Sequence, residues 1–354
     1  MPASTAIRSG NDACDLPGSP GLRVVAIGGG TGLSTLLRGL KHRVPHSAGL
    51  LEVPARAPLI ADLSAVVTVT DDGGSSGRLR RDFNMLPPGD LRNCMVALSE
   101  DEGLISRLFR HRFQKGDLDG HNFGNLFIAA LTDMTGDFGQ AIRTAAEILA
   151  TRGHIYPVTQ TNVTLAAKMS DGSVVRGETN ITASRQRIVE LTLEPPDPPP
   201  PPETLAAIEC ADLITIGPGS LYTSIVTNLL VNGIPEALAN ARATRVFVCN
   251  LMTQANESLH LTASQHIERI YEHAGRAIFD YALVNTAPVS AELRKRYAAE
   301  GAEATIADVE RIEALGVRCV TGNFADEGDV LRHGADRVTD ALLSLPMRMH
   351  APAR

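Results

Sequence analysis

The chain has 354 residues, of which 33 are Lys or Arg and 40 are Asp or Glu, so its formal net charge is −7. This balance excludes a protein that coats nucleic acid, and aromatic residues at 4% with no Trp leave little for base stacking. A nucleotide site is compatible with the charge, because backbone N–H groups hold phosphate without basic side chains.

The ends of the chain and its cysteines indicate a cytoplasmic protein. Residues 1–20 are polar and rich in Gly, Pro and Ser, which predicts a flexible tail and no secretory signal; residues 346–354 are expected to form a second tail. The five cysteines lie far apart and are expected to be reduced thiols: Cys14, Cys94, Cys210, Cys249 and Cys319. Between the tails, residues 21–345 are predicted to form a single α/β domain.

The first half of the chain alternates between apolar runs and helical patterns. Arg23–Ile27 and Ala65–Thr70 read as buried strands, and a helix follows the glycine-rich residues 28–32. Residues 42–60, rich in Pro and Ala, read as a loop insertion. Four further helices are expected at Arg92–Leu98, Leu104–Phe113, Asn125–Leu131 and Ala141–Ala150.

Residues 161–192 differ, because two alternating strands flank Asp171-Gly172, a dipeptide typical of hairpin turns. The segment 195–202 holds seven prolines and predicts a stiff extended spacer. Four short apolar runs then read as strands: Leu213–Ile216, Arg245–Cys249, Tyr281–Val284 and Arg318–Thr321. Strands that are unbroken apolar runs, each followed by a helix, predict a mainly parallel sheet covered on both faces.

The uncharged stretch from Leu213 to Pro235 has the length of a membrane span. It contains Gly217-Pro218-Gly219-Ser220 and several hydroxyl and amide side chains, which favour a strand, a loop and the start of a helix. We therefore expect no insertion into a membrane.

Polar or glycine-rich sequences follow four of the predicted strands, at 28–32, 71–77, 217–220 and 250–254. In an open parallel sheet, ligands bind beyond the carboxyl ends of the strands, so these four segments predict a common site. The first segment matches neither the dinucleotide fingerprint nor a Walker A loop. It predicts an anion site at a helix start, formed by Gly29, Gly30, Thr31 and Gly32; the alternative is a turn that only packs strand against helix.

Asp71 and Asp72 end a strand and precede the hydroxyl-bearing Ser75 and Ser76. Adjacent carboxylates there could hold a divalent ion such as Mg²⁺, act as a base or bind sugar hydroxyls, or they could simply form a turn.

Further candidates lie at helix starts and in the later loops. Asp90 reads as a helix N-cap and, with Asn93, is a second-rank site residue. Asn122 is a candidate hydrogen-bonding partner of a base or sugar, while capping alone could explain Asn125. The later loops add Gly217, Gly219, Ser220, Asn250 and Thr253.

Together these segments resemble the bacterial gluconeogenesis factors of the YvcK type, which are related to the 2-phospho-L-lactate transferases of the CofD-like superfamily. The resemblance rests on IGGGTGLSTLLRGLK, VVTVTDDGGSSGRLRRDF, PPGDLRNCMVAL, HNFGNLFIAALT and IGPGSLYTSIVTNLLVNGIPEAL. It implies a Rossmann-like three-layer α/β/α fold with a β-hairpin excursion. The chain departs from the family pattern in the 42–60 insertion, at Thr227, and after Gln254, where the usual continuation is missing.

The resemblance further implies a ligand of the UDP-sugar class, notably UDP-N-acetylglucosamine, and a regulator of cell shape and wall synthesis on gluconeogenic carbon. In this interpretation the amides of Gly30 and Gly219 converge on one diphosphate, while Asn122, Asn250 and Thr253 contact uridine or sugar. We expect a homo-oligomer and partners among cell-envelope regulators. The alternatives are a transferase of phosphorus-containing groups, with Asp71 and Asp72 as catalytic and metal-binding residues, and a scaffold without a ligand.

Overall fold

The computed structural model describes residues 21–45, 60–100, 103–184 and 186–348. The expected N-terminal tail, most of the 42–60 insertion and the last six residues of the expected C-terminal tail lie outside these ranges. Across the described residues, the helices are too short or too polar to cross a bilayer. The stretch from Leu213 to Pro235 forms a strand, a loop and helical turns, as expected.

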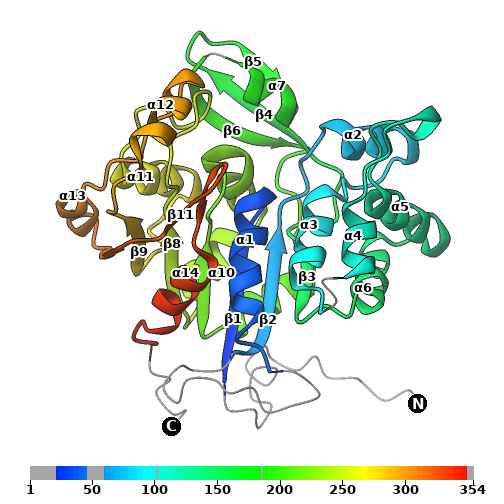
Figure 1. Cartoon of the computed structure of the whole chain (residues 1–354), viewed down its shortest axis with the longest axis horizontal. Helices are drawn as coiled ribbons and strands as arrows, with labels where there is room; N and C mark the ends of the chain where they lie inside the picture. The colour runs from blue at the N-terminus through cyan, green and yellow to red at the C-terminus, as the bar shows by residue number, and fades with distance from the viewer. Residues whose placement is uncertain (1–20, 46–59, 101–102, 185, 349–354) are drawn as a thin grey trace, which may run out of the picture.

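A seven-stranded parallel sheet forms the centre of the molecule, in the order β10–β9–β8–β7–β1–β2–β3 (Figure 1). Its strands are β1 (Leu22–Gly28), β2 (Ile60–Val67), β3 (His154–Pro157), β7 (Leu213–Ile216), β8 (Thr244–Val248), β9 (Tyr281–Asn285) and β10 (Arg318–Gly322). The six apolar runs predicted from the sequence are all strands of this sheet. β3 was not predicted, because its four residues include His154, Tyr156 and Pro157 and carry no apolar run.

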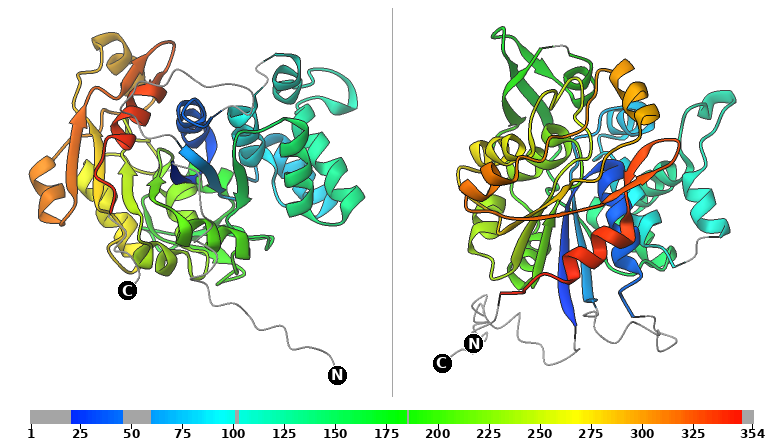
Figure 2. Two further views of the ribbon diagram at one scale, coloured as in Figure 1. Left: turned by 90° about the horizontal axis from the view of Figure 1, so that it is seen from below. Right: turned by 60° about the vertical axis from the view of Figure 1, so that its left-hand side comes forward.

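Helices cover both faces of the sheet, which confirms the predicted α/β class (Figure 2). On one face lie α1 (Gly30–Lys41), α3 (Gly89–Leu98) and α14 (Ala335–Leu343); α8 (Pro202–Cys210) and α10 (Ile234–Asn240) lie on the other. The remaining helices are α2 (Gly74–Phe83), α4 (Leu104–Arg110), α5 (Phe123–Thr135), α6 (Phe138–Ile148), α7 (Glu178–Ala183), α9 (Thr227–Leu229), α11 (Ala263–Ala274), α12 (Ala291–Ala299) and α13 (Val309–Ala314).

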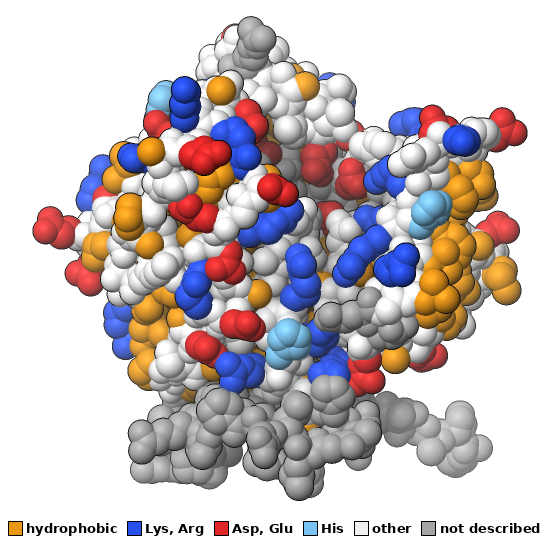
Figure 3. Space-filling model, in the orientation of Figure 1, with side chains coloured by type: hydrophobic (Ala, Val, Ile, Leu, Met, Phe, Trp, Pro, Cys, Tyr) orange, Lys and Arg blue, Asp and Glu red, His pale blue; other side chains and the backbone are white. Residues whose placement is uncertain are grey.

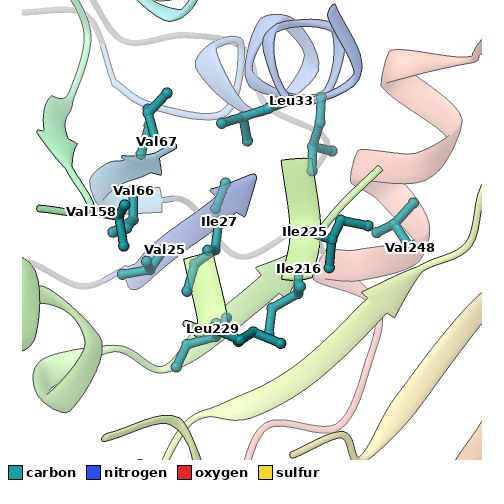
Figure 4. Packing of buried hydrophobic residues seen from close by; sticks show 14 of the residues in the cluster. Val25, Ile27, Leu33, Val66, Val67, Val158, Ile216, Ile225, Leu229 and Val248 are labelled. Atoms are coloured by element: carbon teal, nitrogen blue, oxygen red, sulfur yellow. The ribbon is translucent and has the colours of Figure 1, made fainter. Parts of the chain in front are cut away.

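The core lies between the sheet and these helices. Figure 4 shows Ile27 of β1, Val66 and Val67 of β2 and Ile216 of β7 in one cluster with Leu33 of α1. These side chains are all buried, as are Leu36, Leu37 and Leu40 along the same face of α1. Burying a leucine in this way stabilises the folded state by about 1.5–3 kcal/mol, so α1 is held firmly against β1.

The excursion between residues 161 and 194 is a three-stranded antiparallel sheet in the order β5–β4–β6, above the carboxyl edge of the main sheet (Figure 1). β4 (Thr164–Met169) and β5 (Val174–Arg176) form the predicted hairpin, with Gly172 at φ +84° in its turn. The predicted second strand ends early, because Gly177 adopts φ +88° and α7 begins at Glu178. β6 (Ile188–Glu194) completes this sheet.

Four local predictions need correction. Asp90 lies in the first turn of α3 and does not cap it, since the helix starts at Gly89 after Pro88. α4 ends at Arg110, because Arg112 pairs with Asn122 in an isolated bridge. The proline segment is not uniformly extended: Asp197 has φ +53° and α8 begins at Pro202. Cys210 is disulfide-bonded, whereas Cys94, Cys249 and Cys319 carry free thiols, so the expectation of reduced thiols does not hold for Cys210.

A buried ion pair joins two central strands at the edge opposite the excursion. The Arg245 guanidinium donates to both carboxylate oxygens of Asp280 over 3.1 Å each, and the Arg245 amide donates to the same carboxylate. Although burial opposes ionisation of Asp280, the hydrogen bonds and the charge of Arg245 hold its pKa below the usual value. Arg348 adds a third cationic contact.

We expect Asp280→Asn to lower the free energy of unfolding by about 3 kcal/mol, because it leaves the Arg245 charge buried without its counter-ion. Urea denaturation monitored by circular dichroism measures the change. Asp329→Asn, which neutralises an exposed carboxylate, is the matched control and should change the unfolding free energy by less than about 0.5 kcal/mol. Equal stabilities for the two variants would contradict this account.

Candidate functional site

Two turns meet at the point where the strand order of the sheet reverses. β1 and β7 are neighbours, and the chain leaves them in opposite directions, first towards β2 and later towards β8. Such a switch point is where open α/β sheets bind ligands. The turn after β1 (residues 29–32) and the turn after β7 (residues 218–220) line one cavity of about 540 Å³. Gly30 and Gly219, which were predicted to face one anion, both line this cavity.

The two turns touch through backbone. A Cβ atom at Gly32 would lie 2.3 Å from the carbonyl oxygen of Pro218, and one at Gly219 would lie 3.6 Å from the carbonyl oxygen of Gly29. Gly30 has φ +61°, a conformation that L side chains rarely adopt. Glycine at position 32 is thus required for the close approach of the two turns.

The start of α1 offers N–H groups to the cavity. Gly29 is its N-cap and supplies no side-chain hydrogen bond, and the first turn contains no acidic residue. The first N–H groups of a helix have no intrahelical acceptor, and they attract anions. Gly30 donates its N–H to the carboxyl group of Asp90, which lies behind the turn. The exposed Thr31 and the adjoining Gly32 line the cavity.

Side chains of the segment 250–257 contact the turn after β7. Contrary to the prediction, the Gly219 amide is therefore not free to bind an anion. Asn250 accepts from the Gly219 amide at 3.1 Å and donates to the Gly219 carbonyl at 2.7 Å. Gln254 donates to Ser220 at 2.9 Å. Both turns border one cavity, but the Gly219 N–H already has an acceptor within the chain.

Glu257 closes the start of the following π-helix (Leu221–Val226). Its carboxylate accepts the amides of Tyr222 and Thr223 at 3.0 and 3.3 Å and the Thr223 hydroxyl at 2.9 Å. The side chain is 8% exposed, and burial raises its pKa against the opposing effect of these hydrogen bonds. Glu257 therefore takes the place that a phosphate would take at this helix start.

An acidic group lies beside the cavity, at the carboxyl end of β2. Burial and the neighbouring Asp71 raise the pKa of Asp90 to about 6; burial with Asp90 and Asp71 raises that of Glu178 to about 9. Glu178 also accepts from the Thr70 hydroxyl at 3.0 Å. Asp71, Glu178 and Thr182 line a second cavity of about 380 Å³, and Thr182 also lines the main one. Figure 3 shows acidic side chains inside the hollow below the excursion.

Asp71 and Asp72 do not form a ready-made metal site. Asp72 accepts the amide and hydroxyl of Thr179 at 2.9 and 2.6 Å, while Asp71 accepts the Gly73 amide at 3.0 Å. In the described part of the chain, three or more His, Cys, Asp or Glu side chains nowhere gather in a metal-holding arrangement. The carboxylate chemistry suits Mg²⁺, but the two side chains face different partners, so we assign them no metal.

Eight of the predicted ligand-binding residues line the main cavity: Gly29, Gly30, Thr31, Gly32, Gly219, Ser220, Asn250 and Thr253. Thr253 is buried, and its hydroxyl accepts the Glu303 amide at 3.1 Å. Asn93 accepts from Arg92 at 2.6 Å and, like Gly217, does not line the cavity.

Four other predicted residues form a buried network between α2 and α5, outside the cavity lining. Asn122, and not Asn125, caps α5, because the Asn122 side chain accepts the Asn125 amide at 3.2 Å. Ser75 accepts the Asn122 amide at 3.2 Å, and Ser76 accepts from the Asn125 side chain at 3.3 Å.

Sequence reasoning missed several residues of the cavity wall: Thr182, Glu257, Tyr297, Glu300 and His333. Glu257 belongs to the segment after Gln254 where the family pattern is interrupted. His333 lies on β12 (Leu331–His333), which pairs with β11 (Ala325–Glu327) and has only three residues. The hydrophobic runs around these residues predict buried helices and strands, but they do not indicate which polar side chains line a cavity.

The chain was compared with known families and proteins. The model of the 2-phospho-L-lactate transferase CofD family matches residues 24–325. The gluconeogenesis factor of Bacillus subtilis is 44% identical over 325 residues, covering 91% of this chain and 98% of that protein. The gluconeogenesis factor of Halalkalibacterium halodurans is 45% identical over 322 residues, covering 90% and 95%.

A crystal structure of a Bacillus halodurans protein superimposes with a TM-score of 0.85 at 44% identity, covering 92% of this chain and all of that one. The chain therefore belongs to the CofD family and, within it, is homologous to the bacterial gluconeogenesis factors.

We expect Gly32→Ala to lower the free energy of unfolding by about 1–3 kcal/mol, because the new methyl group collides with the Pro218 carbonyl and separates the two turns. Gly328→Ala is the matched control, since its nearest neighbour would lie 3.9 Å away. Chemical denaturation of both variants measures the difference. A Gly32→Ala protein as stable as the control would show that the contact between the turns is not tight.

We expect stability to depend on pH through Glu178. Its pKa is raised from 4.5 to about 9 on folding, so its contribution is complete below pH 4.5 and is lost as the pH rises towards 9. In wild type the unfolding free energy should therefore decline between pH 5 and 9. In Glu178→Gln this decline should be less steep, by at most about 1.4 kcal/mol per pH unit. Denaturation at several pH values tests this, with the exposed Glu209→Gln as control. Parallel curves for wild type and Glu178→Gln would refute it.

Proposed function

We propose that this member of the CofD family binds a nucleotide sugar, with UDP-N-acetylglucosamine as the first candidate. We further propose that it acts in the cytoplasm as a gluconeogenesis factor that couples carbon supply to cell shape and wall synthesis. The observation that carries the binding proposal is the glycine-rich start of α1, where the N-cap Gly29 supplies no side-chain hydrogen bond and the turn lines a cavity of about 540 Å³ at the switch point of the sheet. That volume is within the usual range for small-molecule sites.

The internal hydrogen bonds of the turn after β7 limit the positions at which an anion can bind. Because Glu257 and Asn250 already satisfy the amides of Tyr222, Thr223 and Gly219, the diphosphate is assigned to the start of α1 alone. The wall formed by residues 250–257 is then left for the polar groups of uridine or sugar. Asn122, which caps α5 outside the cavity lining, is not part of this proposal.

Calorimetric titration with UDP-N-acetylglucosamine tests the proposal, using Thr31→Glu and Thr31→Gln as a pair that differs in one charge. Thr31 is exposed and lies in the first turn of α1, where a carboxylate favours the helix. Thr31→Glu should therefore fold normally but weaken binding at least tenfold, whereas Thr31→Gln should bind within about threefold of wild type. Absence of heat at millimolar ligand, or equal binding by both variants, would contradict the proposal.

A second candidate function is transfer of a phosphorus-containing group, as the family description indicates. What favours it is the acidic group of Asp71, Asp90 and Glu178 beside the cavity, two of whose carboxyl groups have raised pKa values. Perturbed carboxyl groups next to a cleft are common in active sites. A transfer rate that is unchanged in the double variant Asp71→Asn, Asp72→Asn would exclude a role for this strand end in such a reaction.

A further inference from the structure

His333 lies at the boundary between two cavities. It ends β12, and the β11–β12 hairpin lies next to α1 on the face of the sheet that this helix covers (Figure 2). The His333 side chain lines the main cavity and also a neighbouring cavity of about 490 Å³, which Thr35 and Arg38 of α1 line from the other side. Any ligand that extends from the α1 turn towards the hairpin therefore passes this ring.

The hydrogen bonds of His333 fix its tautomer. Nε2 lies 3.0 Å from the carbonyl oxygen of Cys249, at the end of β8, and a carbonyl oxygen can only accept. Nε2 therefore carries the proton. Burial lowers the pKa of His333 to about 4, against the opposing effect of this hydrogen bond, so the ring is neutral near pH 7. In a neutral ring with hydrogen on Nε2, Nδ1 is an acceptor.

Nδ1 is accessible and has no partner within the described residues. It makes no hydrogen bond there. Unlike Nε2 of the buried His266, which also lacks a partner but is enclosed by protein, Nδ1 of His333 is not enclosed. Because His333 is only half-buried and lines the two cavities, the open space that reaches Nδ1 is that of the cavities.

We propose that His333 determines the ligand specificity of the main cavity by presenting a fixed acceptor, Nδ1, to an N–H or O–H group of the nucleotide sugar. The inference rests on the proposed function and adds the chemistry of one contact. A base N–H or a sugar hydroxyl satisfies Nδ1. A group at that position with only lone pairs does not, and it leaves two acceptors facing each other at a desolvated site.

The experiment combines His333 variants with ligands that lack single donors. Wild type, His333→Phe and His333→Asn are titrated by calorimetry with UDP-N-acetylglucosamine and with analogues lacking one donor each, made by N3-methylation of uracil or by removal of one hydroxyl group. Phenylalanine keeps the ring but has no acceptor, whereas asparagine retains both a donor for the Cys249 carbonyl and an acceptor. His154→Phe, at an exposed histidine of β3, is the matched control.

We expect His333→Phe to bind the parent ligand about tenfold more weakly than wild type does. For the one analogue that lacks the donor to Nδ1, the affinities of wild type and His333→Phe should differ by less than about twofold. The affinity of His333→Asn for the parent ligand should lie between those of wild type and His333→Phe, and His333→Asn should still bind that analogue more weakly than the parent ligand. A loss of equal size for every ligand, accompanied by a lower melting temperature, would show a purely structural role and overturn the inference. If His333→Phe does not fold, equal affinities of His333→Asn for all ligands overturn it. Failure of wild type to bind the parent ligand contradicts the proposed function itself.

Discussion

The close approach of two backbone turns is the constraint on which the site depends. β1 and β7 lie side by side at the switch point, so the turns that follow them leave the same edge of the sheet. A Cβ atom at Gly32 would lie 2.3 Å from the Pro218 carbonyl, and the contact therefore exists only because residue 32 is glycine. The buried leucines of α1 hold one turn and the parallel pairing of β1 with β7 holds the other. The rigid sheet thus positions a cavity that neither turn could form alone.

The two turns have similar sequences but different electrostatics. At the start of α1, Gly29 supplies no side-chain hydrogen bond and the Asp90 carboxyl group accepts only the Gly30 N–H. At the start of the π-helix, the Glu257 carboxylate accepts the amides of Tyr222 and Thr223, and Gly219 is paired with Asn250. The N–H groups of Thr31 and Gly32 are therefore left for an external anion, whereas the start of the π-helix already holds an internal one. The two sides of the cavity therefore differ: the start of α1 attracts anions, and residues 250–257 form a wall of hydrogen-bonding groups.

The excursion connects this cavity to the acidic group. Thr179 of α7 donates to Asp72, and Thr182 accepts from Asn256 at 2.6 Å, so one short helix contacts both sides of the carboxyl edge. Burial of Glu178 near Asp90 and Asp71 raises its pKa to about 9, so Glu178 is mostly protonated near pH 7 and adds little repulsion towards an anionic ligand. Neutral His333 on the opposite wall likewise adds no charge. The walls therefore supply hydrogen-bonding groups, and the helix start supplies the attraction for an anion.

The sequence by itself determined the α/β class, six of the seven parallel strands, the hairpin turn at Gly172 and the first candidate turn at residues 29–32. These features follow from local rules: apolar runs form strands, and glycine permits positive φ and close backbone contacts. The tertiary structure decided which polar groups have partners. Glu257 closes the π-helix 35 residues earlier in the chain, and His333 meets the Cys249 carbonyl across 84 residues. Such pairings depend on how strands are ordered in space, and no local pattern around any one of these residues encodes that order.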